Sequence, residues 1–216
     1  MIIKSYELNK INLKKNNIYL LYGKNEGLKN KVINDTFKEF LKNIYKYDEK
    51  EILDNKENFF NTILSKSFFE TKKLIMILRS SDKIVNIIEE ILEKNTEDTI
   101  IILLANILEK KSKLRNFFEK HEEAICIPFY ADNTQTLSSI AYDFFQNRKI
   151  PISQQTINLL IERCKGNREN LNNELEKIEN FTKNKKNISS DDILKLTNLA
   201  ENYNASELAD NCLLKN

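Results

Sequence analysis

The sequence has little of what enzymes of this size use for catalysis. Its 216 residues include three glycines and one histidine. The few glycines argue weakly against substrate-binding loops, although a sequence rich in Lys and Asn would contain few in any case. His121 stands between Lys120 and Glu122, where a solvated residue at a helix end is the simpler interpretation. A Ser–His–Asp or Cys–His site would have to use this histidine, so the sequence does not favour one.

Charge, cysteine spacing and hydropathy exclude further classes of protein. The 34 basic and 32 acidic residues leave a net charge of +2, which excludes nucleic-acid binding by overall charge alone. The cysteines, Cys126, Cys164 and Cys212, are far apart and odd in number, so they predict neither a metal site nor a disulfide framework. The sequence shows no signal peptide and no apolar run of membrane-spanning length. We therefore expect a cytoplasmic protein without metal or cofactor.

Apolar runs alternate with amphipathic segments over the first 130 residues. The continuous Ile- and Leu-rich runs predict strands of a parallel sheet that is covered on both faces. The predicted strands are Ile18–Tyr22, Leu74–Leu78, Thr99–Leu104 and Ala124–Pro128, with a weaker one at Ile44–Asp48. The predicted helices are roughly Leu28–Ile44, Glu57–Leu64, Ile84–Lys94 and Lys110–His121. This alternation indicates a doubly wound α/β domain over residues 1–131.

Only helical periodicity remains after this domain. It predicts a small all-helical domain over residues 132–200. Ser153 starts one of its helices, and the acidic segment Ser189–Asp192 is a start signal for a last helix at Ile193–Leu199. Residues 201–216 are expected to begin a further helical domain.

The segment IYLLYGKNEGLKN, residues 18–30, has the layout of a phosphate-binding loop but lacks its chemistry. A P-loop reads G-x-x-x-x-G-K-[ST], in which the Lys contacts the β- and γ-phosphates and the hydroxyl binds Mg²⁺. Here Gly23 and Gly27 are one residue too close together, Lys29 is displaced, and Asn30 replaces the hydroxyl. The strand, loop and helix are kept while the reactive groups are missing.

Other positions of a nucleotide site are also altered. An α/β domain with a helical lid is the architecture of AAA+ ATPases, which need acids after the strand that faces the P-loop. The first acid after that strand is Asp82, which comes too late. Asn106 could serve as a polar sensor or could simply end its strand. In the lid, GNRE at residues 166–169 is similar to a G-x-x-R motif, but Arg168 is shifted by one residue, about 100° around the helix. ATP hydrolysis is therefore not expected.

The chain resembles the delta subunit of the bacterial DNA polymerase III clamp loader. Four segments carry this resemblance in the order and spacing of the family, the last being the most distinctive: Ile18–Leu28, Ser65–Leu78, Lys110–Tyr130 and Gly166–Ile178. The resemblance implies an AAA+ fold without ATPase activity and a role in DNA replication, binding and opening the ring-shaped sliding clamp. It also implies the partners of that role: the beta clamp, the gamma/tau and delta prime subunits, and DNA within the complex, with no membrane. Family members continue into a helical collar domain, of which this sequence would hold only the start.

The resemblance also implies where the clamp would be bound. Ser67, Phe68 and Phe69 lie between a predicted helix and a predicted strand, where the family inserts a pair of apolar residues into a pocket of the clamp. Two adjacent aromatic residues between Ser67 and Glu70 are hard to bury together inside one domain. A buried Phe contributes about 2–3 kcal/mol, and such anchors dominate interfaces. The alternative is that both rings belong to the core beneath the sheet.

Three alternatives stay open from the sequence. The first is a divergent P-loop ATPase that uses Lys24 or Lys29. The second is an interaction protein of AAA+ ancestry with another partner. The third concerns two basic clusters, which could contact DNA or be solvated surface, since no aromatic platform accompanies them: Lys110, Lys111, Lys113 and Arg115, and Lys183, Lys185 and Lys186.

Overall fold

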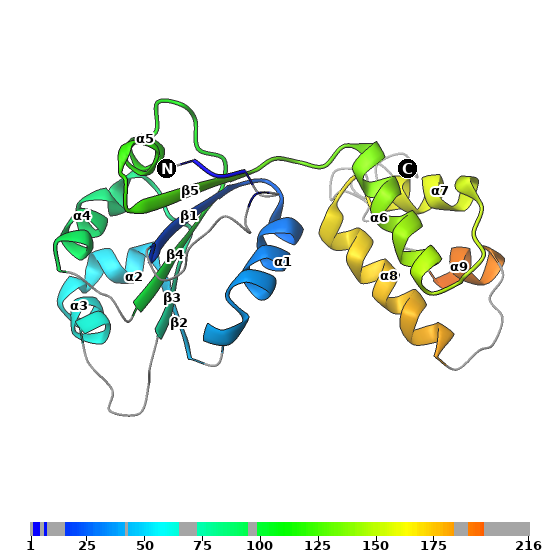
Figure 1. The fold of residues 1–216 in the computed structure, drawn as a ribbon, viewed down its shortest axis with the longest axis horizontal. Coiled ribbons are helices and arrows are strands. Elements are labelled where there is room, and N and C mark those ends of the chain that lie inside the picture. The colour runs from blue at the N-terminus through cyan, green and yellow to red at the C-terminus, as the bar shows by residue number, and fades with distance from the viewer. Residues whose placement is uncertain are drawn as a thin grey trace, which may run out of the picture. The chain divides into compact units, whose positions relative to one another are not determined.

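The structure is a computed structural model that describes residues 2–4, 7, 16–41, 43–64, 73–94, 99–183 and 190–196. The chain divides into two compact units, Met1–Ala131 and Asp132–Asn216 (Figure 1). Residues 67–69, the expected clamp contact, lie outside the described residues. Among the helices of the described part, none has the length and apolar character to cross a membrane.

A five-stranded parallel sheet forms the centre of the first unit. Its strands in chain order are β1 (Ile18–Gly23), β2 (Ile44–Asp48), β3 (Lys73–Leu78), β4 (Thr99–Ala105) and β5 (Ala124–Phe129). Their order across the sheet is β2-β3-β4-β1-β5, and every neighbouring pair is parallel. All five predicted strands are confirmed, each within one residue of its expected ends. Since β1 lies between β4 and β5, the loops that follow these three strands leave the sheet side by side.

Both faces of the sheet are buried, and the α/β fold class is confirmed. Successive strand residues point to opposite faces. On one face, Leu20 and Tyr22 join a core with α3 (Lys56–Leu64), α4 (Val85–Glu93) and α5 (Lys113–Lys120). On the other face, Tyr19 and Leu21 pack with α1 (Glu26–Thr36). Figure 1 shows α1 on the face of the sheet opposite the other three helices. Burial on both sides is the reason that these strands are continuous apolar runs in the sequence.

One predicted helix is too long. The helix expected over residues 28–44 ends at Thr36, and a short 3-10 turn, η2 (Lys38–Phe40), follows. Phe37 causes the break, because its ring is fully buried against Tyr19, 5.0 Å away in an edge-on contact. Helical periodicity in the sequence extended through this point because Phe40 and Leu41 pack against the same core.

Side-chain caps account for two further differences. The sequence analysis missed α2 (Glu49–Asp54), which starts with a capping box between Asp48 and Glu51 directly after β2. The helix expected from Lys110 begins instead at Lys113, because the hydroxyl of Ser112 accepts the amide of Arg115. A short 3-10 turn, η3 (Asp82–Ile84), precedes α4.

The second unit contains four described helices. They are α6 (Thr134–Asn147), α7 (Gln154–Arg163), α8 (Arg168–Thr182) and α9 (Ser190–Leu196). Asn133, Ser153 and Asn167 cap the first three through their side-chain oxygens. One apolar face of each helix contributes to a shared core, which includes Phe145, Leu160 and Leu175. The start of α9 is three residues earlier than expected, and its expected end at residue 199 lies outside the described part.

The core of the second unit can be tested on one helix. On α6, Phe145 is 1% exposed, whereas Tyr142 is 48% exposed. We predict that Phe145→Ala lowers the free energy of unfolding by about 3–5 kcal/mol through loss of burial and cavity formation. Tyr142→Ala on the same helix is the matched control and should cost less than about 1 kcal/mol. Urea unfolding followed by circular dichroism measures both, and equal losses would contradict this core.

Candidate functional site

The loop after β1 depends on Gly23. This residue has φ of 127°, and a Cβ added to it would lie 2.1 Å from the carbonyl oxygen of Phe129 in β5. Both the backbone conformation and the close approach therefore exclude a side chain. The amide of Gly23 donates to the carbonyl of Asn106, at 3.1 Å. Gly23 thus joins the loop to the carboxyl ends of both neighbouring strands.

Most backbone amides of this loop already have acceptors within the protein. Hydrogen bonds to protein oxygens are made by the amides of Gly23, Asn25, Glu26, Leu28 and Lys29. Asn25 organises the turn, because its Oδ1 accepts from Leu28 and its Nδ2 donates to the carbonyl of Tyr130, at 3.1 and 3.0 Å. In a phosphate-binding loop such amides point at the ligand. Here they stabilise the loop itself.

Lys29, the displaced lysine of the loop, is a buried residue of α1. Its side chain is 2% exposed, and its Nζ donates to the carbonyl of Ala105 at 3.1 Å. The same ammonium pairs with Glu26, one turn earlier in the helix, at 2.5 Å. The cation therefore links the start of α1 to the end of β4. The hydrogen bond and the ion pair offset much of the free-energy cost of burying an ammonium group. Gly27 is also buried, whereas Lys24 is exposed.

The acids nearest the end of β3 act as helix and turn caps. Asp82 accepts hydrogen bonds from the hydroxyl of Ser112 at 2.6 Å and from the amide of Leu114 at 3.0 Å, and these bonds lower the pKa of its carboxyl. Glu49 is buried and accepts from both the amide and the hydroxyl of Ser81. In the described ranges, no group of three acidic, histidine or cysteine side chains is placed to hold a metal ion.

Arg168, the lid arginine of the sequence analysis, is engaged within the second unit. Its Nε donates to Oδ2 of Asp132 at 2.6 Å, and its Nη2 donates to the other carboxylate oxygen. Both side chains are nearly buried. This bidentate pair ties the N-terminus of α8 to the segment that enters α6. The structure therefore brings together Gly23, Gly27, Lys29 and Asn106 in the first unit, with Arg168 committed to a structural contact in the second.

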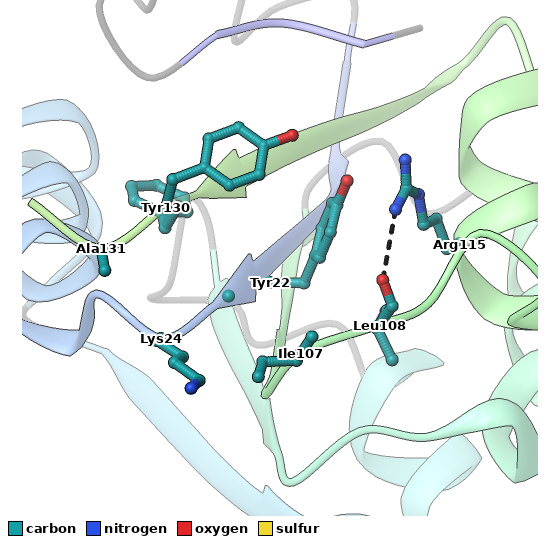
Figure 2. A pocket seen from close by; sticks show the side chains of 9 residues that line it. Tyr22, Lys24, Ile107, Leu108, Arg115, Tyr130 and Ala131 are labelled. Carbon is teal, nitrogen blue, oxygen red and sulfur yellow. Dashed lines mark hydrogen bonds between the residues drawn. The ribbon is translucent and has the colours of Figure 1, made fainter.

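A pocket of about 290 Å³ opens where β1, β4 and β5 end (Figure 2). Its lining comes from three separate loops and from α5: Tyr22, Gly23, Lys24, Ile107, Leu108, Arg115, Phe129, Tyr130 and Ala131. We call it the Tyr22 pocket. The Arg115 guanidinium lies 5.3 Å from the centre of the Tyr22 ring and donates to the carbonyl of Leu108. Burial raises the pKa of Tyr22 to about 12, so its phenol stays protonated at neutral pH.

Sequence reasoning missed this pocket. It singled out Gly23 and Lys24 as loop residues and Arg115 as part of a basic cluster, without connecting them. A usable signal was a large apolar side chain within two residues of the end of a buried strand, since Ile107 and Tyr130 both stand in such positions.

Known structures share this fold. No protein-family model matches the sequence, and no curated protein is significantly similar to it. The Bacillus subtilis DNA clamp loader delta protein YqeN matches 88% of the chain with 19% sequence identity and a TM-score of 0.56. A Thermotoga maritima RuvB mutant matches 88% at 13% identity and a TM-score of 0.54. The Thermotoga maritima RuvB Holliday junction branch migration motor matches 88% at 12% identity and a TM-score of 0.50.

These similarities show the fold and no more. The chain spans 60% of the delta protein and 64% of each RuvB chain. It therefore shares the fold of these proteins, a parallel α/β domain with a helical part, as expected from the sequence.

The steric role of Gly23 predicts a large loss of stability on substitution. Gly23→Ala should lower the free energy of unfolding by about 3 kcal/mol or more, because the new Cβ meets the Phe129 backbone and φ is unfavourable. Gly166→Ala is the matched control, since Gly166 also has positive φ but nothing lies within 4 Å of an added Cβ. It should cost only about 1–2 kcal/mol. Thermal and urea unfolding compare the two, and similar losses would argue against the close approach to β5.

Proposed function

We propose that this chain is a clamp-loader subunit that binds and opens a sliding clamp and hydrolyses no ATP itself. The absence of ATP hydrolysis is proposed because the loop after β1 is closed by its own hydrogen bonds. Five of its amides and the ammonium of Lys29 are bonded to protein oxygens, so a phosphate would have to displace internal hydrogen bonds in order to bind. A loop that is stable without ligand suits a fold used for mechanical work on a partner.

Two observations support the role as a clamp-loader subunit. The fold is similar to that of a clamp loader delta protein, and four segments of the sequence resemble the delta family. In this role the partners are the beta clamp, the gamma/tau and delta prime subunits, and DNA within the complex. The protein would act in the cytoplasm. Residues 1–131 and 132–200 would be the two AAA+ domains of the subunit, and residues 201–216 would begin its collar.

The proposed clamp contact is the segment Ser67-Phe68-Phe69. It follows α3 after Leu64, whose side chain is exposed at the end of that helix. By analogy with the family, these rings would enter a pocket of the clamp and supply most of the binding energy.

The clamp contact predicts a separation of binding from stability. Phe68→Ala combined with Phe69→Ala should abolish binding to the sliding clamp of the same organism while leaving the melting temperature nearly unchanged. Tyr142→Ala removes an exposed aromatic residue in the second unit and should leave clamp binding intact. Surface plasmon resonance and thermal unfolding measure the two quantities. A large drop in melting temperature would instead assign both rings to the core, and full clamp binding by the double variant would refute the contact.

The rival function is a divergent P-loop ATPase, which the similarity to RuvB chains favours. Mg²⁺–ATP at 100 times the Kd of such a site would add about 2.7 kcal/mol to stability. For a chain of this size that corresponds to a rise in melting temperature of roughly 5–10 °C. We predict no such rise, because the loop amides are occupied. A rise that disappears in Lys29→Ala, with the fold retained, would support the ATPase.

A further inference from the structure

The Tyr22 pocket contains a phenol hydroxyl that has no hydrogen-bond partner among the described residues. Tyr22 is 5% exposed, and its hydroxyl makes no hydrogen bond within the described part of the chain. Figure 2 shows this hydroxyl on the side where Arg115 and Tyr130 also present their polar ends. A ligand with a suitable acceptor or donor can therefore bond to this hydroxyl without displacing a bond within the protein.

Arg115 supplies a second donor to the same pocket. Its Nε donates to Glu119 at 2.7 Å and its Nη1 donates to the carbonyl of Leu108 at 3.2 Å. No hydrogen bond from Nη2 is present among the described residues. Because Glu119 already neutralises the guanidinium, Arg115 offers hydrogen-bond donors without a net positive charge. It is therefore better suited to a neutral carbonyl oxygen than to a carboxylate or a phosphate.

The walls of the pocket suit a flat aromatic group. Ile107 is 58% exposed and Tyr130 is 74% exposed, so a large apolar surface remains uncovered at the rim. A volume of about 290 Å³ is at the small end of ligand pockets, which begin at about 300 Å³. One planar ring system would fill this space, whereas a whole nucleoside triphosphate would not. Tyr130 provides the aromatic platform that the sequence analysis did not find beside the basic residues of this region.

The position of the pocket in the sheet favours ligand binding. The chain passes from β1 through α1 toward β2, and from β4 through α5 to β5 on the other side of β1. The strand order therefore switches beside β1. In doubly wound sheets, ligands bind outside the carboxyl ends of the strands at such a switch point.

We propose that the Tyr22 pocket binds one base of a single-stranded nucleic acid. The base stacks on Tyr130, and its exocyclic carbonyl accepts hydrogen bonds from the Tyr22 hydroxyl and from Nη2 of Arg115. Lys24 is exposed on the wall of the pocket and contacts a neighbouring phosphate. This site is separate from the proposed clamp contact at residues 67–69, so either can fail without the other.

The test compares a short labelled oligothymidine with an abasic oligomer of the same length, using fluorescence anisotropy on the full chain. Tyr130→Ala should weaken oligothymidine binding about 5-fold or more through loss of stacking. Tyr22→Phe removes only the hydroxyl and should weaken it about 2- to 10-fold. Neither should change binding of the abasic oligomer. Lys24→Gln should weaken both oligomers and reduce the salt dependence.

Controls separate this site from folding and from the clamp. Tyr142→Ala removes another exposed tyrosine and should leave both affinities unchanged, as should the double substitution of Phe68 and Phe69. Melting temperatures should stay near that of the unchanged protein for Tyr130→Ala and Tyr22→Phe. The proposal is wrong if oligothymidine and the abasic oligomer bind equally, if neither binds, or if Tyr130→Ala leaves oligothymidine binding intact. Loss of clamp binding in Tyr130→Ala with normal DNA binding would assign the pocket to a protein partner and would also overturn it.

Discussion

The close approach of Gly23 to the backbone of Phe129 is the constraint on which the first unit depends. It places the end of β1 directly against β5, where only a glycine fits. The following turn can then bond to both neighbouring strands, through the carbonyls of Asn106 and Tyr130. Because these contacts come from strands far apart in the sequence, the loop is held by tertiary structure rather than by its own local preference.

The loop after β1 has the layout of a phosphate-binding loop, but its amides are hydrogen-bonded within the protein. The first amides of a helix have no partners within the helix and must find other acceptors. In this chain Asn25 and the neighbouring carbonyls take that role at the start of α1, and Lys29 bonds inward to Ala105. Other charged groups are also bonded within the protein. Asp82 and Glu49 accept hydrogen bonds from backbone amides, and Arg168 forms an ion pair with Asp132. Polar groups that would serve chemistry in a nucleotide site contribute to stability here.

The polar groups of the Tyr22 pocket are different in this respect. Tyr22 is buried, yet its hydroxyl has no partner in the described residues, and exposed apolar side chains stand at the pocket rim. Most polar groups of the neighbouring loop have hydrogen-bond partners, whereas the Tyr22 hydroxyl is available to a ligand. The contrast between a closed loop and an open pocket, both beside Gly23, is the physical basis of the two proposals, a mechanical role for the former and ligand recognition for the latter.

The sequence by itself determined the fold class and all five strands, because strands buried on both faces must be continuously apolar. It also located the loop of Gly23 and the lack of P-loop chemistry, since both are local patterns. It could not find the end of α1 at Thr36, which depends on the packing of Phe37 against Tyr19. The clamp contact at Phe68 and Phe69 stays a prediction from resemblance. Only the tertiary structure decided which groups the charges of Lys29 and Arg168 contact. It also decided that Tyr22, Arg115 and Tyr130 share one pocket. These contacts join residues that are distant in the chain and that meet only at the edge of a folded sheet or between packed helices.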